Sequence, residues 1–268
     1  MFKLQLIFFR YLFFFLKIGY PFGIFPWTIN KDKYLKIFND IKIKRYPNID
    51  DYEQKKKFKI EKEWIDNLAL TTQVVIKESE INYQHGRLLY SELSEYILNK
   101  NYDFNILETG TARGFSSICM AKALFDRNKN GKILTIDILP HNRKIIWNCI
   151  KDLSGKSTRE ELLQDWKNLL EYINFKQGRS ERILETNNID RVHFAFLDGA
   201  HNKKTVEYEF EWVAKRQLKN DIIIFDDYSM SQFNGIYKLI NEIEDTKRYL
   251  IKKVNSDQNR AYAIAYKL

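Results

Sequence analysis

The chain has 268 residues, 44% of them hydrophobic and 29% charged, which is enough for one or two folded domains. With ten glycines and four prolines, this composition excludes collagen-like, proline-rich and wholly disordered proteins. A net charge of +9 fits nucleic acid or anionic lipid, but without an arginine-rich stripe we favour solvated lysines and no nucleic-acid partner. Two cysteines, Cys119 and Cys149, are too few for a disulfide framework and indicate a reducing, cytoplasmic compartment.

Residues 1–30 differ in composition from the rest of the chain. They contain no acidic residue and eight of the 19 phenylalanines. Arg10 and Lys17 interrupt the apolar run and glycines and prolines from residue 19 onward break it, so a spanning helix is not predicted, and no small-residue cleavage site follows. The basic residues of this segment are Lys3, Arg10 and Lys17. Their spacing of seven places them on one stripe of a helix. We expect residues 1–27 to attach the protein peripherally to the inner face of the membrane, and the alternative is a helix packed on this protein or on a second subunit of a homo-oligomer.

Residues 31–80 form a charged extension, in which we expect short helices and turns around Pro47. Its densest charge run, residues 55–57, is typical of a solvated helix face. We expect this extension to pack loosely on the domain formed by residues 81–268.

Strands and helices alternate from about residue 84 onward. Apolar strands are predicted at residues 104–108, 132–138, 173–178, 192–198 and 221–227, with a closing antiparallel pair at 249–254 and 260–266. Helices are predicted at 88–98, 115–125, 143–151, 158–173, 203–218 and 233–246. This order is typical of an α/β fold: a doubly wound, mostly parallel, seven-stranded Rossmann-like sheet with an antiparallel C-terminal strand.

Acidic residues stand at the carboxyl ends of the predicted strands. In an open parallel sheet, ligands bind beyond these ends. Five carboxylates on one edge would repel one another unless cations meet them. The sequence therefore predicts a ligand site at this edge, containing Glu108, Asp137, Asp198, Asp226 and Asp227.

A glycine-bearing turn, residues 108–114, follows the first strand. It lacks the pattern of dinucleotide-binding turns because Ala112 replaces the middle glycine. The carboxylate of Glu108 beside it favours a ligand with a cationic head, such as the ammonium and sulfonium groups of S-adenosylmethionine.

Four motifs occur in order: ILETGTARGFSS, LTIDILPH, FLDGAH and IIIFDDY. Together they resemble the class I S-adenosylmethionine-dependent methyltransferases, in particular the macrocin O-methyltransferase and cephalosporin-hydroxylase-like branch. The resemblance covers residues 81–268 and implies methylation of a hydroxyl on a small-molecule or glycan acceptor, such as a sugar or lipid-linked precursor. The alternatives are an RNA or protein methyltransferase, and a non-catalytic membrane-associated protein that retains the fold.

The resemblance also implies residues that contact S-adenosylmethionine. On the methionine side these are Glu108, Thr109, Gly110, Thr111, Gly114 and Ser116. Asp137 would accept the ribose hydroxyls, and the residues implied around the adenine are Ile138, Gly178 and Ser180.

A magnesium ion held by Asp198, Asp226 and Asp227 is implied by the same resemblance. It would lower the pKa of the acceptor hydroxyl. The alternative is that Asp198 and Asp226 orient the cofactor and the loops without a metal. His201 is a candidate general base because a histidine pKa lies near neutral pH, and the alternative is a loop or helix-cap residue. We take Asp198 and His201 as the catalytic pair.

The segment 141–171 is longer than a crossover between parallel strands requires. It contains Arg143, Trp147 and Lys151. We expect it to lie over the active edge and to offer aromatic and cationic groups to the acceptor, and the alternative is a surface helix with solvated charges.

Overall fold

The computed structural model describes residues 31–77, 80–257 and 260–268. The described chain opens with three helices, α2 (Lys31–Lys42), α3 (Pro47–Lys56) and α4 (Lys62–Thr72). The alternating part consists of α5 (His85–Ile97), β1 (Phe104–Thr109), α6 (Phe115–Asp126), β2 (Gly131–Asp137), β3 (Ile173–Gln177), α9 (Ser180–Glu185), β4 (Phe194–Leu197), α10 (Lys203–Ala214), β5 (Ile222–Phe225), α11 (Asn234–Asp245), β6 (Tyr249–Asn255) and β7 (Ala261–Lys267). All seven predicted strands are present, whereas the sequence pattern did not predict α9.

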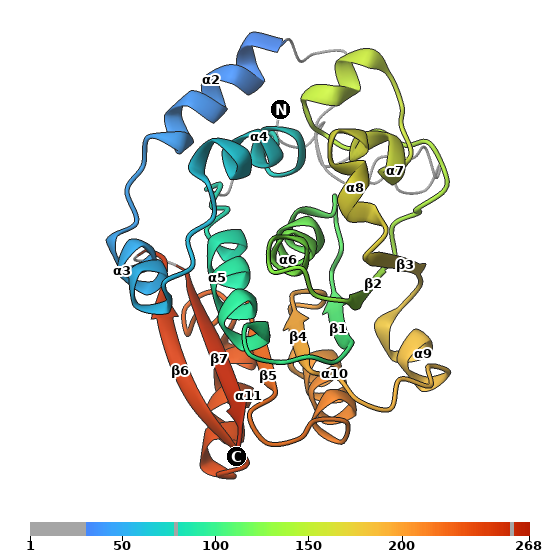
Figure 1. Cartoon of the computed structure of the whole chain (residues 1–268). Helices are drawn as coiled ribbons and strands as arrows, with labels where there is room; N and C mark the ends of the chain where they lie inside the picture. The colour runs from blue at the N-terminus through green and yellow to red at the C-terminus, as the bar shows by residue number, and fades with distance from the viewer. Residues whose placement is uncertain (1–30, 78–79, 258–259) are drawn as a thin grey trace, which may run out of the picture.

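The strands form one seven-stranded sheet in the order β3-β2-β1-β4-β5-β7-β6. Strands β1 to β5 are mutually parallel, and β7 runs antiparallel to both of its neighbours (Figure 1). The predicted Rossmann-like sheet with an antiparallel C-terminal strand is therefore confirmed. Its parallel strands bring the ends of β1, β2, β4 and β5 to one edge.

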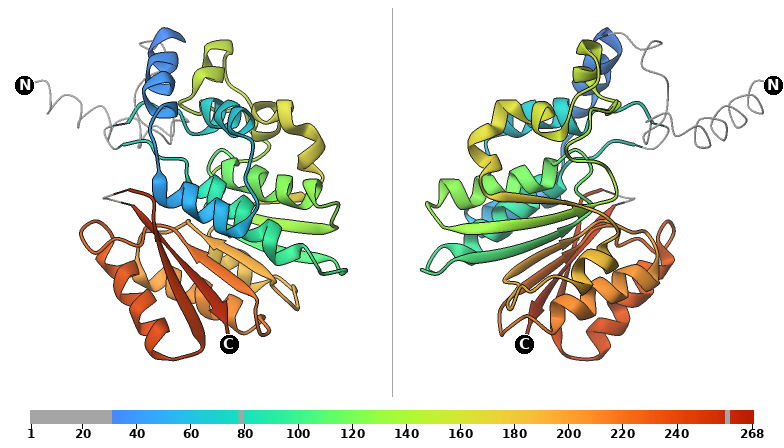
Figure 2. Two further views of the ribbon diagram at one scale, coloured as in Figure 1. Left: turned by 60° about the vertical axis from the view of Figure 1, so that its left-hand side comes forward. Right: turned by 90° about the vertical axis from the view of Figure 1, so that its right-hand side faces the viewer.

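Helices cover both faces of the sheet, with α5 and α6 on one face and α10 and α11 on the other (Figure 2). Successive residues of the central strands alternate between the two cores: Phe194 and Phe196 face the first, Ala195 and Leu197 the second. Burial on both faces explains why β4 and β5 are continuous apolar runs in the sequence.

The N-terminal helices pack tightly, contrary to the loose packing that we expected. Their buried side chains belong to the same core as α5 and α6. The hydroxyl of Tyr52 and the ammonium of Lys56, both on α3, contact the buried carboxylate of Glu92 on α5. The hydroxyl of Tyr266 on β7 donates to the same carboxylate at 2.9 Å. Each of the three helices buries one face, with Tyr34 on α2, Ile49 on α3 and Leu68 on α4. The lysines around these residues made the buried faces difficult to recognise in the sequence.

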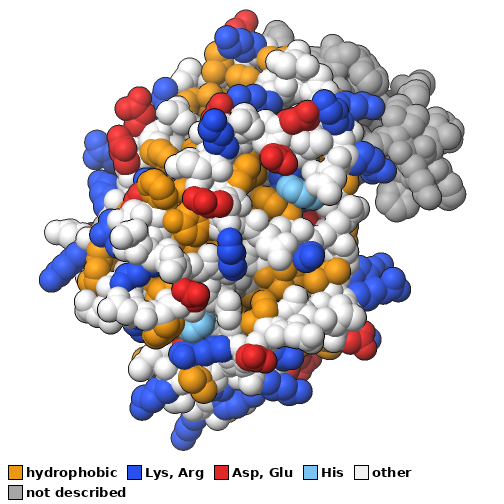
Figure 3. Space-filling view, turned by 45° about the vertical axis from the view of Figure 1, so that its right-hand side comes forward, with side chains coloured by type: hydrophobic (Ala, Val, Ile, Leu, Met, Phe, Trp, Pro, Cys, Tyr) orange, Lys and Arg blue, Asp and Glu red, His pale blue; other side chains and the backbone are white. Residues whose placement is uncertain are grey.

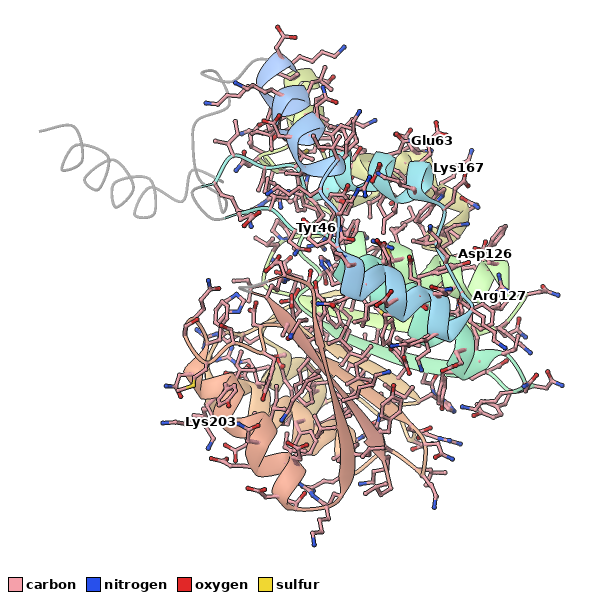
Figure 4. All side chains as sticks on the ribbon, turned by 90° about the vertical axis from the view of Figure 1, so that its left-hand side faces the viewer. Tyr46, Glu63, Asp126, Arg127, Lys167 and Lys203 are labelled. Atoms are coloured by element: carbon pink, nitrogen blue, oxygen red, sulfur yellow. The ribbon has the colours of Figure 1, made fainter. Side chains whose placement is uncertain are left out.

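Figure 4 shows from the side the helices that lie on the two faces of the sheet. Tyr46 is labelled in the turn between α2 and α3, and Lys203, at the start of α10, is labelled on the opposite side of the sheet. Lys203 pairs with Glu242 and so joins α10 to α11.

The segment between β2 and β3 differs from the prediction. In place of the helix predicted over 143–151, residues 143–149 contain no helix and a 3₁₀ helix, η2 (Ile150–Ser154), follows them. The region predicted as one helix over 158–173 is divided into three short pieces, α7 (Arg159–Leu162), η3 (Gln164–Trp166) and α8 (Lys167–Leu170). A capping box begins α7: Glu161 N–H donates to the Thr158 hydroxyl at 3.1 Å, and Thr158 N–H donates to the Glu161 carboxylate at 2.8 Å.

The proposed anchor helix, residues 1–27, lies outside the described residues. Within the part that the structure describes, we find no helix with the length and apolar character needed to cross a membrane.

Candidate functional site

Two loops meet at the carboxyl edge of the sheet, one after β1 and one after β4. Gly110 has φ +91°, and a Cβ atom there would lie 2.1 Å from the carbonyl oxygen of Asp198. Asp198 N–H donates to the Thr109 carbonyl at 3.0 Å. Only glycine therefore allows the two backbones to approach this closely. This contact brings the glycine turn next to the FLDGAH loop, as the sequence predicts.

Glu108 is fully buried beneath the glycine turn. The hydroxyls of Ser116, Ser117 and Thr135 donate to its carboxylate, the last at 2.5 Å. Burial raises the pKa of Glu108, and the three hydroxyl donors oppose that rise. Glu108 and Ser116 thus hold the turn together from inside, and their contact with a cofactor stays a prediction.

The threonines of the turn are also bonded within the protein. The Thr109 hydroxyl donates to Glu209 on α10 at 3.0 Å, and the Thr111 hydroxyl lies 2.5 Å from that of Thr135. Both threonines are buried, so their predicted hydrogen bonds to the cofactor remain predictions.

Asp137 ends β2 beside the glycine turn. Its carboxylate accepts the N–H of Ala112 at 2.6 Å and that of Leu139 at 2.8 Å. Each carboxylate oxygen keeps a further lone pair, so two ribose hydroxyls remain acceptable partners. Gly178 N–H donates to the Asp137 carbonyl at 2.8 Å, which places Gly178 and the exposed Ile138 close to the same carboxylate. Ser180 begins α9 just beyond Gly178. Asp137, Ile138 and Gly178 are therefore brought together.

Asp226 follows β5 and is 1% exposed. The Nε of Arg260, at the start of β7, donates to its Oδ1 at 3.2 Å, and the guanidinium Nη2 contacts its Oδ2. Burial opposes ionisation of Asp226, but the adjacent Arg260 outweighs it and holds the pKa of this carboxyl below its usual range. Both carboxylate oxygens are thus engaged by one arginine.

His201 and Asp227 form a second pair at the same edge. The imidazole Nδ1 lies 2.6 Å from Asp227 Oδ2, and this hydrogen bond raises the pKa of His201. Asn202, the next residue, caps α10 by accepting the N–H of Thr205 at 3.0 Å, which fixes the loop that carries His201. The His201 ring also packs on Phe233 at 5.1 Å between centroids.

Asp198 lies between the glycine turn and the Asp226–Arg260 pair. Burial and the neighbouring Asp226 carboxylate raise the pKa of Asp198 well above its usual range, although Arg260 opposes the rise. The three predicted aspartates are therefore close enough to influence one another, as expected.

The sequence analysis missed two cations at this edge. Arg260 comes from the last strand, and Lys77 from the segment that follows α4. Partial loss of hydration and the charges of Arg260 and Arg113 lower the pKa of Lys77, whereas Asp227 and Asp198 raise it. The only sequence signal was indirect: crowded carboxylates require nearby cations, but nothing in the pattern said which.

The predicted magnesium site does not fit the observed side chains. Both oxygens of Asp226 are bound to Arg260, and one oxygen of Asp227 is bound to His201. In the described ranges, no three His, Cys, Asp or Glu side chains converge closely enough to hold a metal ion. The cations that meet these carboxylates belong to the chain itself.

The segment 141–171 lies beside the glycine turn, but its aromatic group points inward. Trp147 is fully buried, its carbonyl accepts from Arg113 Nε at 2.6 Å, and Leu163 packs over Gly114. Asn148 joins this segment to the chain after α4, since its side chain donates to the Ile76 carbonyl at 3.0 Å. The expectation that Trp147 faces an acceptor is therefore wrong.

Comparisons with known proteins agree with this geometry. Residues 107–228 match the family described as "Methyltransferase domain". No curated protein sequence matches the chain.

Several solved structures share the fold at low sequence identity. The O-methyltransferase TomG from Streptomyces achromogenes, solved with S-adenosylmethionine, is 16% identical, with a TM-score of 0.55 over 78% of this chain and 91% of that one. An O-methyltransferase from Bacillus cereus, solved with S-adenosylhomocysteine, is 17% identical, with a TM-score of 0.51 over 87% and 96%. The O-methyltransferase NovP is 15% identical, with a TM-score of 0.54 over 76% and 97%. The family match and these likenesses agree: residues 107–228 are similar to a methyltransferase domain, and the chain has the fold of the O-methyltransferases.

Proposed function

We propose that this protein is an O-methyltransferase in which the His201–Asp227 pair removes the proton of an acceptor hydroxyl. The observation that carries the proposal is the 2.6 Å contact between His201 Nδ1 and Asp227 Oδ2, on the loop next to the glycine turn. With Nδ1 held by a carboxylate, Nε2 is the ring nitrogen left to face a substrate. The magnesium assistance expected from the resemblance is not included, because Arg260 engages Asp226.

The reaction requires one proton and one methyl group to move. The hydroxyl proton passes to His201 Nε2, and the hydroxyl oxygen attacks the methyl carbon of the sulfonium in line. The carbon–sulfur bond breaks, and the products are a methyl ether, S-adenosylhomocysteine and a protonated histidine. Holding both reactants in this alignment can contribute roughly 7–11 kcal/mol to lowering the barrier. In this proposal Asp198, whose backbone contacts the glycine turn, positions the cofactor and takes no part in the proton transfer.

The acceptor in this proposal is a hydroxyl of a small molecule or glycan, such as a sugar or a lipid-linked precursor at the cytoplasmic side of a membrane. On the face drawn in Figure 3, Lys and Arg side chains are spread out with Asp and Glu between them. That distribution does not favour an RNA acceptor on this face. The membrane part of the proposal depends on residues 1–27, and deleting them should move the protein from the membrane pellet to the soluble fraction.

The first test is calorimetric titration of S-adenosylmethionine into wild type and into Asp137→Ala. The proposal predicts binding by wild type and a loss in the variant, because Asp137 both orients Ala112 and faces the ribose position. Asp190→Ala, which removes an exposed carboxylate before β4, at the opposite edge of the sheet, is the matched control. No binding by wild type would reject the proposal. Where binding holds, release of S-adenosylhomocysteine is then measured with a panel of sugar and diol acceptors.

A further inference from the structure

The acidic edge of the sheet is neutralised by an arginine that is part of the fold. Arg260 stands at the start of β7, which is hydrogen-bonded to β5 along its length. Its Nε and Nη2 engage the two oxygens of Asp226, and its Nη1 donates to the Asn82 carbonyl at 3.4 Å. The Arg260 backbone N–H donates to Asp257 at 2.9 Å. The guanidinium is therefore held from several directions at one place.

Acidic and basic side chains meet at this edge within the described chain. Asp198, Asp226 and Asp227 supply the carboxylates, and Arg260, Lys77 and a protonatable His201 lie among them. A divalent cation would need oxygen ligands with free lone pairs facing a common point. The paired guanidinium nitrogens instead occupy the side of Asp226 on which such an ion would be coordinated. A divalent ion placed against Arg260 would also be strongly repelled.

We infer that Arg260 is a positioning residue that replaces a divalent cation at the acidic edge, so that methyl transfer at this site proceeds without a metal. The inference rests on the proposed function for its catalytic consequence. Arg260 keeps Asp226 ionised and fixed, and Asp226 in turn accepts the N–H of Asp227 at 2.8 Å. That bond sets the backbone of Asp227, whose φ is +59°, and thereby aims its carboxylate at His201.

Manganese binding, followed by electron paramagnetic resonance, tests this inference directly. Wild type should bind no Mn²⁺ at this edge, and Arg260→Lys, which keeps the charge, should behave in the same way. Arg260→Ser leaves Asp226 unpaired beside two other carboxylates. Its affinity for Mn²⁺ should rise at least about 100-fold, because a unit positive charge is removed from within about 4 Å of the ion. Adding Asp226→Asn to Arg260→Ser should abolish the gain.

Arg248→Ser is the matched control, since Arg248 pairs with the single carboxylate of Glu211 on the surface. It should gain no Mn²⁺ affinity. Stoichiometric Mn²⁺ binding by wild type that is lost in Asp226→Asn would overturn the inference, and this measurement stands even if Arg260→Ser does not fold. A folded Arg260→Ser that gains no affinity would also overturn it.

The same samples separate this inference from the proposed function. S-adenosylmethionine is titrated into wild type in the presence of a chelator. Failure to bind the cofactor would reject the proposed function. The Mn²⁺ measurement would still test the role of Arg260, because it does not depend on the cofactor. Binding and turnover that persist in chelator, together with Mn²⁺ capture by Arg260→Ser alone, are the results that we expect.

Discussion

Replacing Gly110 by alanine tests whether the close contact between the β1 and β4 loops builds the cofactor site. Gly155 provides a control for backbone strain without a steric clash, because its φ of +102° with ψ −171° also favours glycine and no atom lies within 4 Å of its would-be Cβ. An alanine at the positive φ of Gly110 costs about 1–2 kcal/mol by itself, and an alanine at Gly155 costs about 1–3 kcal/mol. Gly155→Ala should therefore lose about that much stability.

At Gly110 a steric term adds to the backbone strain. The new Cβ would lie 2.1 Å from the Asp198 carbonyl oxygen, whereas ordinary contacts begin at 3.4 Å, so the two loops must separate by more than 1 Å. That movement breaks the Asp198–Thr109 backbone hydrogen bond and leaves buried groups unpaired, at a further cost of about 1–3 kcal/mol. The total for Gly110→Ala is about 2–5 kcal/mol, or a fall in Tm of roughly 4–9 °C for a chain of this size.

Urea unfolding and calorimetric titration of S-adenosylmethionine measure both consequences. Gly110→Ala should unfold at clearly lower urea than Gly155→Ala and should bind the cofactor at least about tenfold more weakly, equivalent to about 1.4 kcal/mol. Gly155→Ala should bind like wild type. Equal stability losses in the two variants, with unchanged cofactor affinity in Gly110→Ala, would refute the reasoning.

Three further predictions concern single side chains. Burial raises the pKa of Glu209 to about 7, above its unfolded value, so the stability that its neutral form supplies is complete below the unfolded pKa and is lost as pH rises through 7. In wild type the free energy of unfolding should therefore fall as pH rises, and Glu209→Gln should remove about 3 kcal/mol of this fall. Urea unfolding at pH 5 and pH 8.5 measures it, and the same fall in the variant as in wild type would contradict the prediction. His201→Gln should lower kcat by about 10²–10⁴ with cofactor affinity unchanged, and full retention of kcat would argue against a general base. Asp152 accepts the backbone N–H groups of Trp147 and Cys149 at 2.9 and 3.0 Å, so Asp152→Ala should cost about 1–3 kcal/mol and speed hydrogen exchange at both amides, whereas unchanged exchange would show that these bonds are not protective.

The sheet could be predicted from the sequence because its signals are local. The run of isoleucines in β5 is apolar at every position, as a strand buried on both faces must be, and the glycine turn identifies the end of β1. The helix expected over 143–151 could not be excluded from local pattern. Its residues are acceptable in a helix, but the backbone there is organised around Asp152 and the buried ring of Trp147. Tertiary contacts decided that conformation.

In the candidate site, the acidic residues could be predicted from the sequence and the basic residues could not. Asp137, Asp198 and Asp227 were found because each lies at the carboxyl end of a strand. Arg260 and Lys77 were missed because they reach the same edge from the last strand and from the chain after α4, and only the folded topology shows that they meet the carboxylates. The magnesium prediction rested on the negative charges alone, because the sequence did not show which positive charges lie beside them.

The contacts between α5, with the residues just before it, and the last two strands have a consequence for biosynthesis. Tyr266 and Glu92 are 174 positions apart, and so are Asn82 and Ser256, whose side chains bond at 2.7 Å. At about 5–20 residues per second, a ribosome needs roughly 10–35 s to add that length of chain. During this interval the nascent chain carries helix α3 and the glycine turn without the strand that completes them. The candidate site can therefore mature only after β6 and β7 have emerged from the ribosome.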